Sequence, residues 1–253
     1  MMEKIESTKN QKVKNWKKLL TRKGRNKAGQ YLIEGFHLIE EAIRANIIIQ
    51  CLIIREDVMN SEWVESIESV ETYEVSSEVA SELADTGTTQ GVFAVLNIEE
   101  RKTETVEKPY LFIDAVQDPG NVGTLIRSAD AAGFGGVVLG EGSADLYNPK
   151  TLRSTQGSHF HLNVISGELE RWVGSFQAKG YAVYGTALDE RAVDYSNEKQ
   201  TQPFGLIVGN EGAGVRSELL EVTDKNLYIP IKGQAESLNV AIAASILMFS
   251  IYQ

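Results

Sequence analysis

The chain has 253 residues, 42% of them hydrophobic and 24% charged, which is ordinary for a folded globular protein of one large or two small domains. Its single cysteine, Cys51, lies in the apolar run 47–54, which excludes a disulfide scaffold or a cysteine-based zinc site. The N-terminus lacks the apolar stretch of a secretory signal, and the longest apolar run, 240–252, is too short to cross a bilayer of about 30 Å. We therefore expect a cytoplasmic protein without a membrane partner.

The charge of the chain is unevenly distributed. Its net charge is −10, but residues 1–30 hold ten lysine and arginine residues and two glutamates, a local charge of +8 that leaves −18 elsewhere. A concentrated basic segment on an acidic protein is typical of phosphate contact with a nucleic acid. A basic helix that is merely solvated is the alternative interpretation.

The first predicted domain, residues 1–98, is a small α/β unit. Ser7 can cap a helix that places Val13, Trp16 and Leu20 on one face. The elements that follow are a strand at 30–34, a helix at 36–45, a strand at 47–54, a helix at 60–69, a strand at 72–75, a helix at 77–84 and a strand at 92–98.

A charged segment at 99–108, whose only apolar residue is Val106, predicts a linker before the second domain at 109–253. The predicted elements there are strands at 110–116, 136–139, 181–187, 204–209 and 226–229, and helices at 122–132, 169–179, 215–222 and 238–252. Alternating strands and helices predict a parallel sheet covered on both faces, with functional groups beyond the carboxyl ends of the strands.

Three polar clusters follow strands of this domain. In the first, residues 118–130, Asn121 can cap the next helix and Arg127 lies six residues further on. In the second, residues 209–214, Asn210 and Glu211 stand among glycines that permit close backbone approach. In the third, residues 229–240, Ser237 sits where an N-cap belongs. Ordinary turns and caps are the competing interpretation of each cluster.

Several familiar sites are missing from the sequence. The first strand of the second domain is not followed by G-x-G-x-x-G, and there is no Walker A motif, so an ordinary dinucleotide or P-loop site is excluded. His159 and His161 have no third ligand at a recognisable spacing, so we expect two structural histidines on a strand and no metal.

In this order, the three clusters resemble the three motifs of the SpoU family (TrmH-type, SPOUT class) of RNA 2′-O-ribose methyltransferases. The matching strings are DPGNVGTLIRSADAAGF (118–134), IVGNEGAGV (207–215) and IPIKGQAESLNVAIAASI (229–246). In the first domain STKNQKVK (7–14), RKGR (22–25) and YLIEG (31–35) resemble the substrate-binding domain of many members, which is similar to the ribosomal protein L30e fold. One departure is STQGS (154–158), where many members carry Ser-x-Gly-Ala.

The resemblance implies an α/β fold: a C-terminal SPOUT domain with a parallel sheet and a deep trefoil knot, preceded by the small L30e-like α/β domain. It also implies a homodimer that binds S-adenosyl-L-methionine (SAM), needs no metal, and methylates RNA. The implied SAM-binding residues are Thr186, Leu188, Gly209, Ile229, Leu238 and Asn239. Those implied for RNA are Lys14, Arg22, Lys23 and Arg25.

The resemblance further implies Arg127, Asn121, Glu211, Ser237 and Asn239 as the catalytic set, with Arg127 as general base. A guanidinium stays protonated, because its pKa lies above about 12. We therefore expect Arg127 to stabilise the developing 2′-oxyanion or to clamp a phosphate, while the proton leaves through Glu211 or water.

Large-subunit (23S) rRNA is the expected substrate, because the first domain resembles a ribosomal protein fold. The alternatives are a tRNA substrate, methylation of a base nitrogen, or an RNA-binding, ribosome-associated protein that has lost catalysis. The polar residues of all three motifs are present, which disfavours lost catalysis, and the N-V-G-x-x-x-R (121–127) and E-S-L-N (236–239) strings favour ribose.

Overall fold

The structure is a computed structural model that describes all residues except 1–2, 66, 68–69, 86, 100–106 and 190. It consists of two units, an N-terminal unit of residues 1–100 with 147–160, and a C-terminal unit of residues 101–146 with 161–253. Most of the predicted linker at 99–108 lies outside the described residues. Residues 147–160 fall within the predicted second domain, but in the structure they pack with the N-terminal unit.

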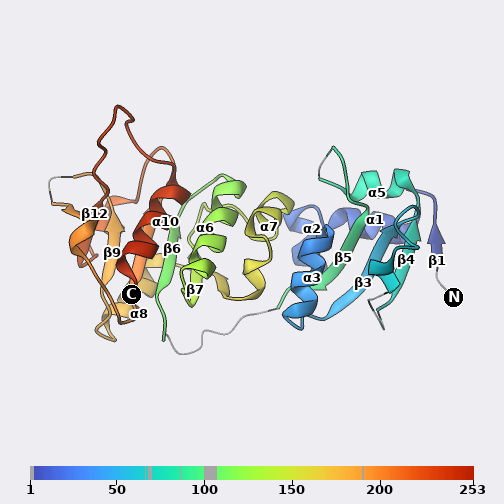
Figure 1. Cartoon of the computed structure of the whole chain (residues 1–253), viewed down its shortest axis with the longest axis horizontal. Helices are drawn as coiled ribbons and strands as arrows, with labels where there is room; N and C mark the ends of the chain where they lie inside the picture. Colours follow the sequence, from blue (N-terminus) through green and yellow to red (C-terminus); the bar gives the residue numbers. More distant parts are fainter. Residues whose placement is uncertain (1–2, 66, 68–69, 86, 100–106, 190) are drawn as a thin grey trace. The chain divides into compact units, whose positions relative to one another are not determined.

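The N-terminal unit is built on a mixed five-stranded sheet with the order β1-β4-β3-β5-β2 (Figure 1). Its strands are β1 (Glu3–Ile5), β2 (Gln30–Glu34), β3 (Ile49–Arg55), β4 (Thr72–Val75) and β5 (Val92–Asn97). Its helices are α1 (Gln11–Lys18), α2 (Arg22–Ala28), α3 (Phe36–Arg44), α4 (Glu62–Glu65), α5 (Ser77–Leu83), α7 (Pro149–Thr155) and the 3-10 turn η1 (Ser158–Phe160). Strands β2 and β4 have the predicted bounds, whereas β1 was not predicted.

Both faces of this sheet are apolar and both are covered. Successive side chains of a strand point to opposite faces, so Cys51 and Ile53 of β3 join one core while Leu52 and Ile54 join the other. Helices α1 and α5 cover the first face, and α3 covers the second. Leu152 of α7 completes the second core, which is why the 147–160 segment belongs to this unit.

Helix α1 begins later than predicted. Its N-cap is Asn10, whose side chain accepts from the backbone N–H of Lys12 at 2.8 Å, and not Ser7. Val13 and Trp16 are buried as predicted, but the helix ends at Lys18, so Leu19 is buried in the core while Leu20 is only partly buried.

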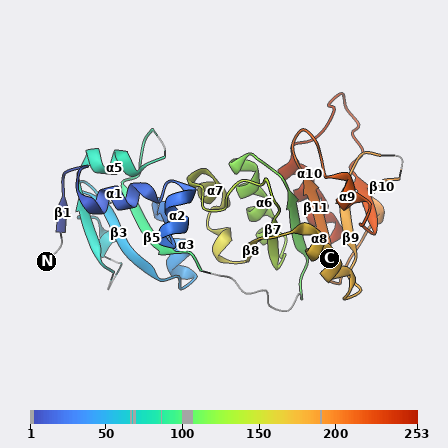
Figure 2. The same ribbon diagram turned by 180° about the vertical axis from the view of Figure 1, so that it is seen from behind.

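The C-terminal unit contains a seven-stranded sheet with the order β10-β12-β9-β11-β6-β7-β8, and each pairing in it is parallel (Figure 1 and Figure 2). Its strands are β6 (Tyr110–Asp114), β7 (Gly136–Leu139), β8 (Asn163–Ser166), β9 (Val183–Thr186), β10 (Val193–Asp194), β11 (Gly205–Gly209) and β12 (Lys225–Tyr228). Its helices are α6 (Pro119–Ala131), α8 (Leu169–Gln177), α9 (Ser217–Leu220), α10 (Val240–Ile251) and the 3-10 turn η2 (Tyr195–Asn197). The predicted parallel sheet is confirmed.

The central strands of this sheet are buried on both faces, as expected for a parallel sheet. Every residue of β6 and of β11 is buried. One layer of the core joins Phe112 and Ile207 to Val173 and Phe176 of α8. Of the helices that the structure describes, none is long and apolar enough to cross a membrane.

The two histidines do not alternate on a strand, so that expectation is wrong. His159 lies in η1 of the N-terminal unit, is buried, and its Nδ1 lies 2.9 Å from Thr155 Oγ1. His161 begins the next segment of the C-terminal unit, and its Nδ1 lies 2.9 Å from Asp130 Oδ2. They occupy separate structural positions and share no site.

Candidate active site

The three polar clusters meet at one edge of the parallel sheet. Strands β12, β9, β11 and β6 are neighbours in that order, and their carboxyl ends lie side by side because they are parallel. The segments that leave these ends contain residues 114–121, 186–188, 209–216 and 229–239. Residues that are far apart in the sequence are therefore brought together there.

Asn121 occupies the first turn of α6 and does not cap it. The N-cap is Asp118, whose Oδ1 accepts from the Asn121 backbone N–H at 2.9 Å, and Pro119 follows at the first helical position. The helix therefore begins three residues earlier than predicted. Because Asp118 satisfies the helix terminus, the Asn121 side chain is available for other contacts.

The Glu211 carboxylate accepts three hydrogen bonds from the segment around the start of α6. Its Oε1 accepts from Asn121 Nδ2 at 3.0 Å and from the backbone N–H of Asp118 at 3.3 Å, and its Oε2 accepts from that of Gln117 at 3.3 Å. Partial burial raises the pKa of Glu211, but these donors, with the Asn121 amide foremost, outweigh burial and hold the pKa below its ordinary value. Glu211 is therefore an ionised acceptor.

Asn239 connects the third cluster to the other two. It is the N-cap of α10, in place of the predicted Ser237, and its Oδ1 accepts from the backbone N–H groups of Ala241 at 2.9 Å and Ile242 at 3.3 Å. Its Nδ2 donates to Asn121 Oδ1 at 3.0 Å. The cap fixes the orientation of the Asn239 amide, which in turn fixes that of Asn121. The result is one directed chain of hydrogen bonds, from Asn239 through Asn121 to Glu211.

Asn210 folds the loop that presents Glu211. Its Oδ1 accepts from the backbone N–H groups of Gly212 at 2.9 Å and Ala213 at 3.0 Å, and its Nδ2 donates to the carbonyl of Ala115 at 2.9 Å. Ala115, just after β6, has a φ of +55°, which is uncommon for a residue with a side chain. Asn210 thus holds both its own loop and the bend that aims the residue 117 and 118 N–H groups at Glu211.

Gly209 allows this loop to return close to its own start. A Cβ added at Gly209 would lie 2.1 Å from the carbonyl carbon of Gly214 and 2.1 Å from the nitrogen of Val215. Gly214 itself has a φ of +73°, which favours glycine. A side chain at position 209 therefore requires the whole 210–215 loop to move.

Asp114 and Arg216 form an ion pair that was not predicted from the sequence. Asp114 ends β6 and is fully buried, and it accepts from the backbone N–H of Arg216 at 2.9 Å and from Arg216 Nε at 2.8 Å. Arg216 also lies 3.2 Å from Glu170. Asp114 is a single carboxylate at the end of an otherwise apolar strand, and this pattern could have indicated a buried carboxylate with a partner. The pair fastens the second cluster to the strand that leads into the first.

Arg127 and Ser237 lie outside the hydrogen-bonded chain. Arg127 is exposed on α6 and, within the described part of the protein, its side chain makes no hydrogen bond or ion pair. Ser237 is exposed in the 230–239 segment. The structure therefore places both at the surface with their polar atoms available.

The residues predicted to hold SAM lie at the carboxyl ends of neighbouring strands or in the segments that follow them. Thr186 ends β9 and its hydroxyl donates to the carbonyl of Ile207 at 3.0 Å. Leu188 is 82% exposed and Leu238 is 36% exposed, while Ile229 is half-buried just beyond β12. Exposed apolar side chains in the segments that follow neighbouring strands suit an adenine ring and a methionine chain. The residues present therefore fit SAM.

Of the four residues predicted to contact RNA, three are accessible. Lys14, Arg22 and Lys23 are exposed on α1 and α2. Arg25 is 3% exposed, and its NH1 donates to the carbonyl of Leu19 at 2.9 Å. Arg25 therefore joins α1 to α2 and is unsuited to phosphate contact.

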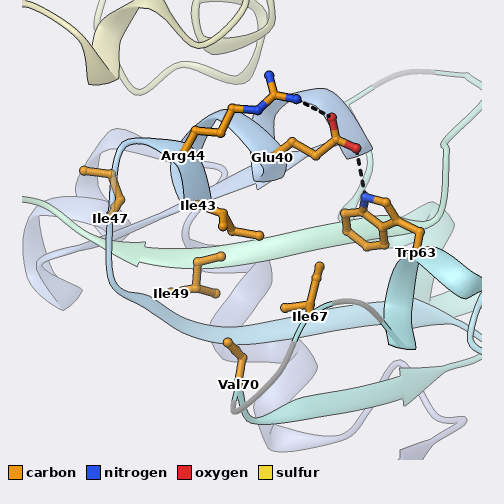
Figure 3. A pocket seen from close by; sticks show the side chains of 8 residues that line it. All are labelled: Glu40, Ile43, Arg44, Ile47, Ile49, Trp63, Ile67 and Val70. Atoms are coloured by element: carbon orange, nitrogen blue, oxygen red, sulfur yellow. Dashed lines mark hydrogen bonds and ion pairs between the residues drawn. The ribbon is translucent and has the colours of Figure 1, made fainter.

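An apolar pocket of about 400 Å³ opens elsewhere in the N-terminal unit (Figure 3). Glu40 stands at its edge, accepting from Trp63 Nε1 at 3.0 Å and lying 3.8 Å from Arg44. The remaining lining residues are Ile43, Ile47, Ile49, Ile67 and Val70. None of the residues predicted to act in catalysis, in SAM binding or in RNA binding lines this pocket.

Comparison with protein families identifies both parts of the chain. Residues 108–249 match the SpoU rRNA Methylase family, and residues 10–94 match the MRM3-like substrate binding domain. The chain is 51% identical over 248 residues to the 23S rRNA (guanosine(2553)-2′-O)-methyltransferase RlmP of Bacillus subtilis, with 98% of each chain covered.

A more distant relative and a solved structure agree. The chain is 30% identical to the 23S rRNA (uridine(2479)-2′-O)-methyltransferase of Streptomyces viridochromogenes, covering 96% of this chain and 90% of the relative. The crystal structure of an AdoMet-bound rRNA methyltransferase from Sinorhizobium meliloti superposes with a TM-score of 0.86 at 29% identity, covering 98% and 97% of the two chains. The chain belongs to the SpoU rRNA methylase family, as its motifs predicted.

Proposed function

We propose that this protein transfers a methyl group from SAM to a ribose 2′-OH of 23S rRNA. The observation that carries the proposal is the hydrogen-bonded chain from Asn239 through Asn121 to Glu211, which unites all three motifs at the edge of the sheet. The relatives at 51% and 30% identity are both named 23S rRNA 2′-O-methyltransferases, and they act on different nucleotides. What these two relatives share is 23S rRNA as substrate and the ribose 2′-oxygen as the methylated atom, which supports both for this protein.

Bound SAM supplies a methyl group on a positively charged sulfur, whose thioether is a good leaving group. Methyl transfer forms an O–C bond at the ribose, breaks a C–S bond and releases the hydroxyl proton to an acceptor. In this proposal Gly209, Ile229 and Leu238 hold SAM with their backbone groups, and Thr186 and Leu188 line the same site. Ser237 and Asn239, on either side of Leu238, position the reacting groups.

Glu211 positions other groups in this proposal and does not accept the proton. Both of its oxygens already accept hydrogen bonds, and its pKa is lowered, first by the Asn121 amide acting against burial. A carboxylate stabilised in this way is a weaker base than an ordinary one. Water therefore carries the proton away, and Glu211 anchors Asn121.

Arg127 stabilises the oxyanion that develops on the ribose, or the phosphate beside it. Its guanidinium is exposed and carries no ion pair among the described residues, so its charge is available to the substrate. A permanent cation favours the transition state because negative charge increases there. The role of general base does not suit it.

RNA binding by the N-terminal unit and assembly of two copies complete the proposal. Lys14, Arg22 and Lys23 contact phosphates. Helix α10 exposes Ile242 (55%) and Phe249 (60%), which are seven residues apart and so lie on one face. Large exposed apolar side chains on one face are typical of an interface, here with a second copy. The trefoil knot and a cytoplasmic location stay predictions.

The test is methyl transfer by the purified chain. The protein is incubated with labelled SAM and with rRNA or tRNA from a strain lacking this gene, and the RNA is digested to nucleosides. We expect label in a 2′-O-methylnucleoside from 23S rRNA, with EDTA causing no loss. Label in a base-methylated nucleoside, or in tRNA alone, would overturn the proposal, and SAM binding without transfer to any RNA would favour an inactive RNA-binding protein.

A further inference from the structure

A second hollow of the N-terminal unit lies between α1, α2 and the sheet and has a volume of about 440 Å³. Four buried residues form its floor: Trp16 from α1, Leu19 just after α1, Cys51 from β3 and Tyr73 from β4. Three exposed residues surround its mouth: Asn15, Lys18 and Lys27. The hollow therefore combines an apolar, aromatic floor with a cationic mouth.

The floor suits a flat, weakly polar group. The Trp16 and Tyr73 rings are edge to face, with centroids 5.3 Å apart. Burial is the main cause that raises the pKa of the Cys51 thiol to about 11, and the charge of Glu71 is the second. The floor therefore carries no thiolate at neutral pH. At the mouth, Asn15 Oδ1 accepts from Lys18 Nζ at 3.1 Å, while the Asn15 amide nitrogen donates to no described residue. That nitrogen is free to hydrogen-bond the edge of a base.

The lysines of this region fall into two groups. Lys12 contacts Glu3, and Lys17 contacts Glu82, so their charges are neutralised within the protein. The second group, which consists of Lys14, Lys18, Lys23 and Lys27, forms no ion pair with any residue that the structure describes.

The second group is arranged as two like-charged pairs. Lys14 and Lys18 are four residues apart on α1, and Lys23 and Lys27 are four residues apart on α2. Like charges at this spacing destabilise a helix, so an anion from outside the chain is the natural partner. One member of each pair, Lys18 or Lys27, lines the hollow.

We propose that this hollow binds one unpaired RNA nucleotide, with its base against Trp16 and its flanking phosphates on Lys18 and Lys27. The inference rests on the proposed function, since it assumes that RNA is the substrate. The bases of a duplex are stacked and cannot enter, whereas a base in a loop or bulge can leave the stack and meet an aromatic surface. The hollow therefore selects single-stranded over double-stranded RNA.

Two variants of the full chain test the two halves of the site. Lys18→Ala with Lys27→Ala removes the cations, and Lys108→Ala with Lys179→Ala removes the same charge from exposed positions of the other unit. Asn15→Trp blocks the mouth without a change of charge, and Asn26→Trp makes the same replacement at an exposed position of α2 that does not line the hollow.

Affinity is measured with a fluorescein-labelled single-stranded RNA of about ten nucleotides, within the usual site size, and with the same sequence as a duplex. The lysine variant should bind the single strand more weakly and flatten the slope of log K against log salt by about 1.4, the value for two lost phosphate contacts. Asn15→Trp should weaken the affinity for the single strand about tenfold, as expected when one base loses its stacking. Both controls should bind like the wild type, and unchanged melting temperature and SAM affinity show that the variants fold.

The outcomes separate this inference from the proposed function. If the lysine variant binds weakly while Asn15→Trp binds normally, no base enters the hollow and the inference is wrong. If all variants bind like the wild type while the wild type methylates rRNA, the inference fails and the proposed function stands. If the variants weaken binding as predicted but the wild type methylates no RNA, the hollow is supported and the proposed function fails.

Discussion

Asn239 and Asn121 are 118 residues apart in the chain and share a hydrogen bond of 3.0 Å between Asn239 Nδ2 and Asn121 Oδ1. The same Asn239 side chain caps α10 through its oxygen. One residue therefore both starts the last helix and orients an amide at the start of α6. Capping uses the side-chain oxygen of Asn239, whereas the contact with Asn121 uses its side-chain nitrogen. Different substitutions can therefore separate the two functions.

Asn239→Asp should preserve stability and lose activity, because aspartate caps helices as well as asparagine but cannot donate to Asn121. Asn239→Ala should lose both, with a decrease of about 1 kcal/mol in the free energy of unfolding. We expect single-turnover methylation to fall about 100-fold in both variants, the scale of a misplaced reacting group. Urea denaturation and rapid-quench assays measure the two effects. An active Asn239→Asp variant would show that the link to Asn121 is dispensable.

Arg127→Ala should reduce the single-turnover rate by about 10² to 10³, the usual cost of removing a donor that stabilises developing charge. SAM affinity and melting temperature should hardly change, because the side chain is exposed and has no partner among the described residues. Arg171→Ala, at another exposed arginine, is the control. Loss of SAM binding in Arg127→Ala would instead place this arginine in the cofactor site.

Glu211→Gln should destabilise the protein in a pH-dependent way. The folded-state pKa of Glu211 lies below its ordinary value of 4.5, so its stabilising contribution is present above that value and is lost as the pH falls through the folded pKa. The difference in unfolding free energy between wild type and variant should therefore shrink from pH 7 to about pH 3. Denaturation across this range measures it. A difference that stays constant with pH would show that Glu211 carries no lowered pKa.

Gly209→Ala should abolish SAM binding and lower the melting temperature, because its Cβ would lie 2.1 Å from the backbone of Gly214. Gly212→Ala is a matched control in the same loop, since its Cβ would meet nothing closer than Asn210 Oδ1 at 3.6 Å. Calorimetric titration with SAM and thermal unfolding are the measurements. Equal effects of the two substitutions would contradict the close approach seen at Gly209.

Ile242→Asp with Phe249→Asp should dissociate the proposed dimer. Light scattering of the wild type should give about twice 27.9 kDa, and the variant should give the monomer mass. Val222→Asp with Val193→Asp introduces the same charge at two apolar residues outside α10, which are 46% and 38% exposed, and should leave the dimer intact. A wild-type monomer that methylates RNA would refute the assembly.

Most strands could be predicted because their apolar runs are long and bounded by polar residues. Strand β7 at 136–139 was predicted residue for residue, whereas the short β1 was missed, since Glu3–Ile5 carries one buried residue and no alternation. The predicted helix starts differ from the observed ones where two nearby residues could each act as the N-cap. Asp118 caps α6 and Asn239 caps α10, although Asn121 and Ser237 fit the same pattern in the sequence.

The sequence indicated candidate site residues, but it did not show how they are connected. The motifs indicated Asn121, Glu211 and Asn239, yet only tertiary structure shows which atoms they share. Arg25 was predicted to bind RNA from its basic neighbourhood, and it is buried because the turn between α1 and α2 needs a donor at Leu19. Charge patterns report composition along the chain, whereas burial depends on how the helices pack.

The most direct test of the central claim is a map of ribose 2′-O-methylation across 23S rRNA from cells with and without this gene. We predict that one 2′-O-methyl group disappears from 23S rRNA in the deletion strain. The wild-type gene should restore this group, and Arg127→Ala should not. An unchanged methylation map would show that the protein does not methylate 23S rRNA ribose, and restoration by Arg127→Ala would show that Arg127 is not needed.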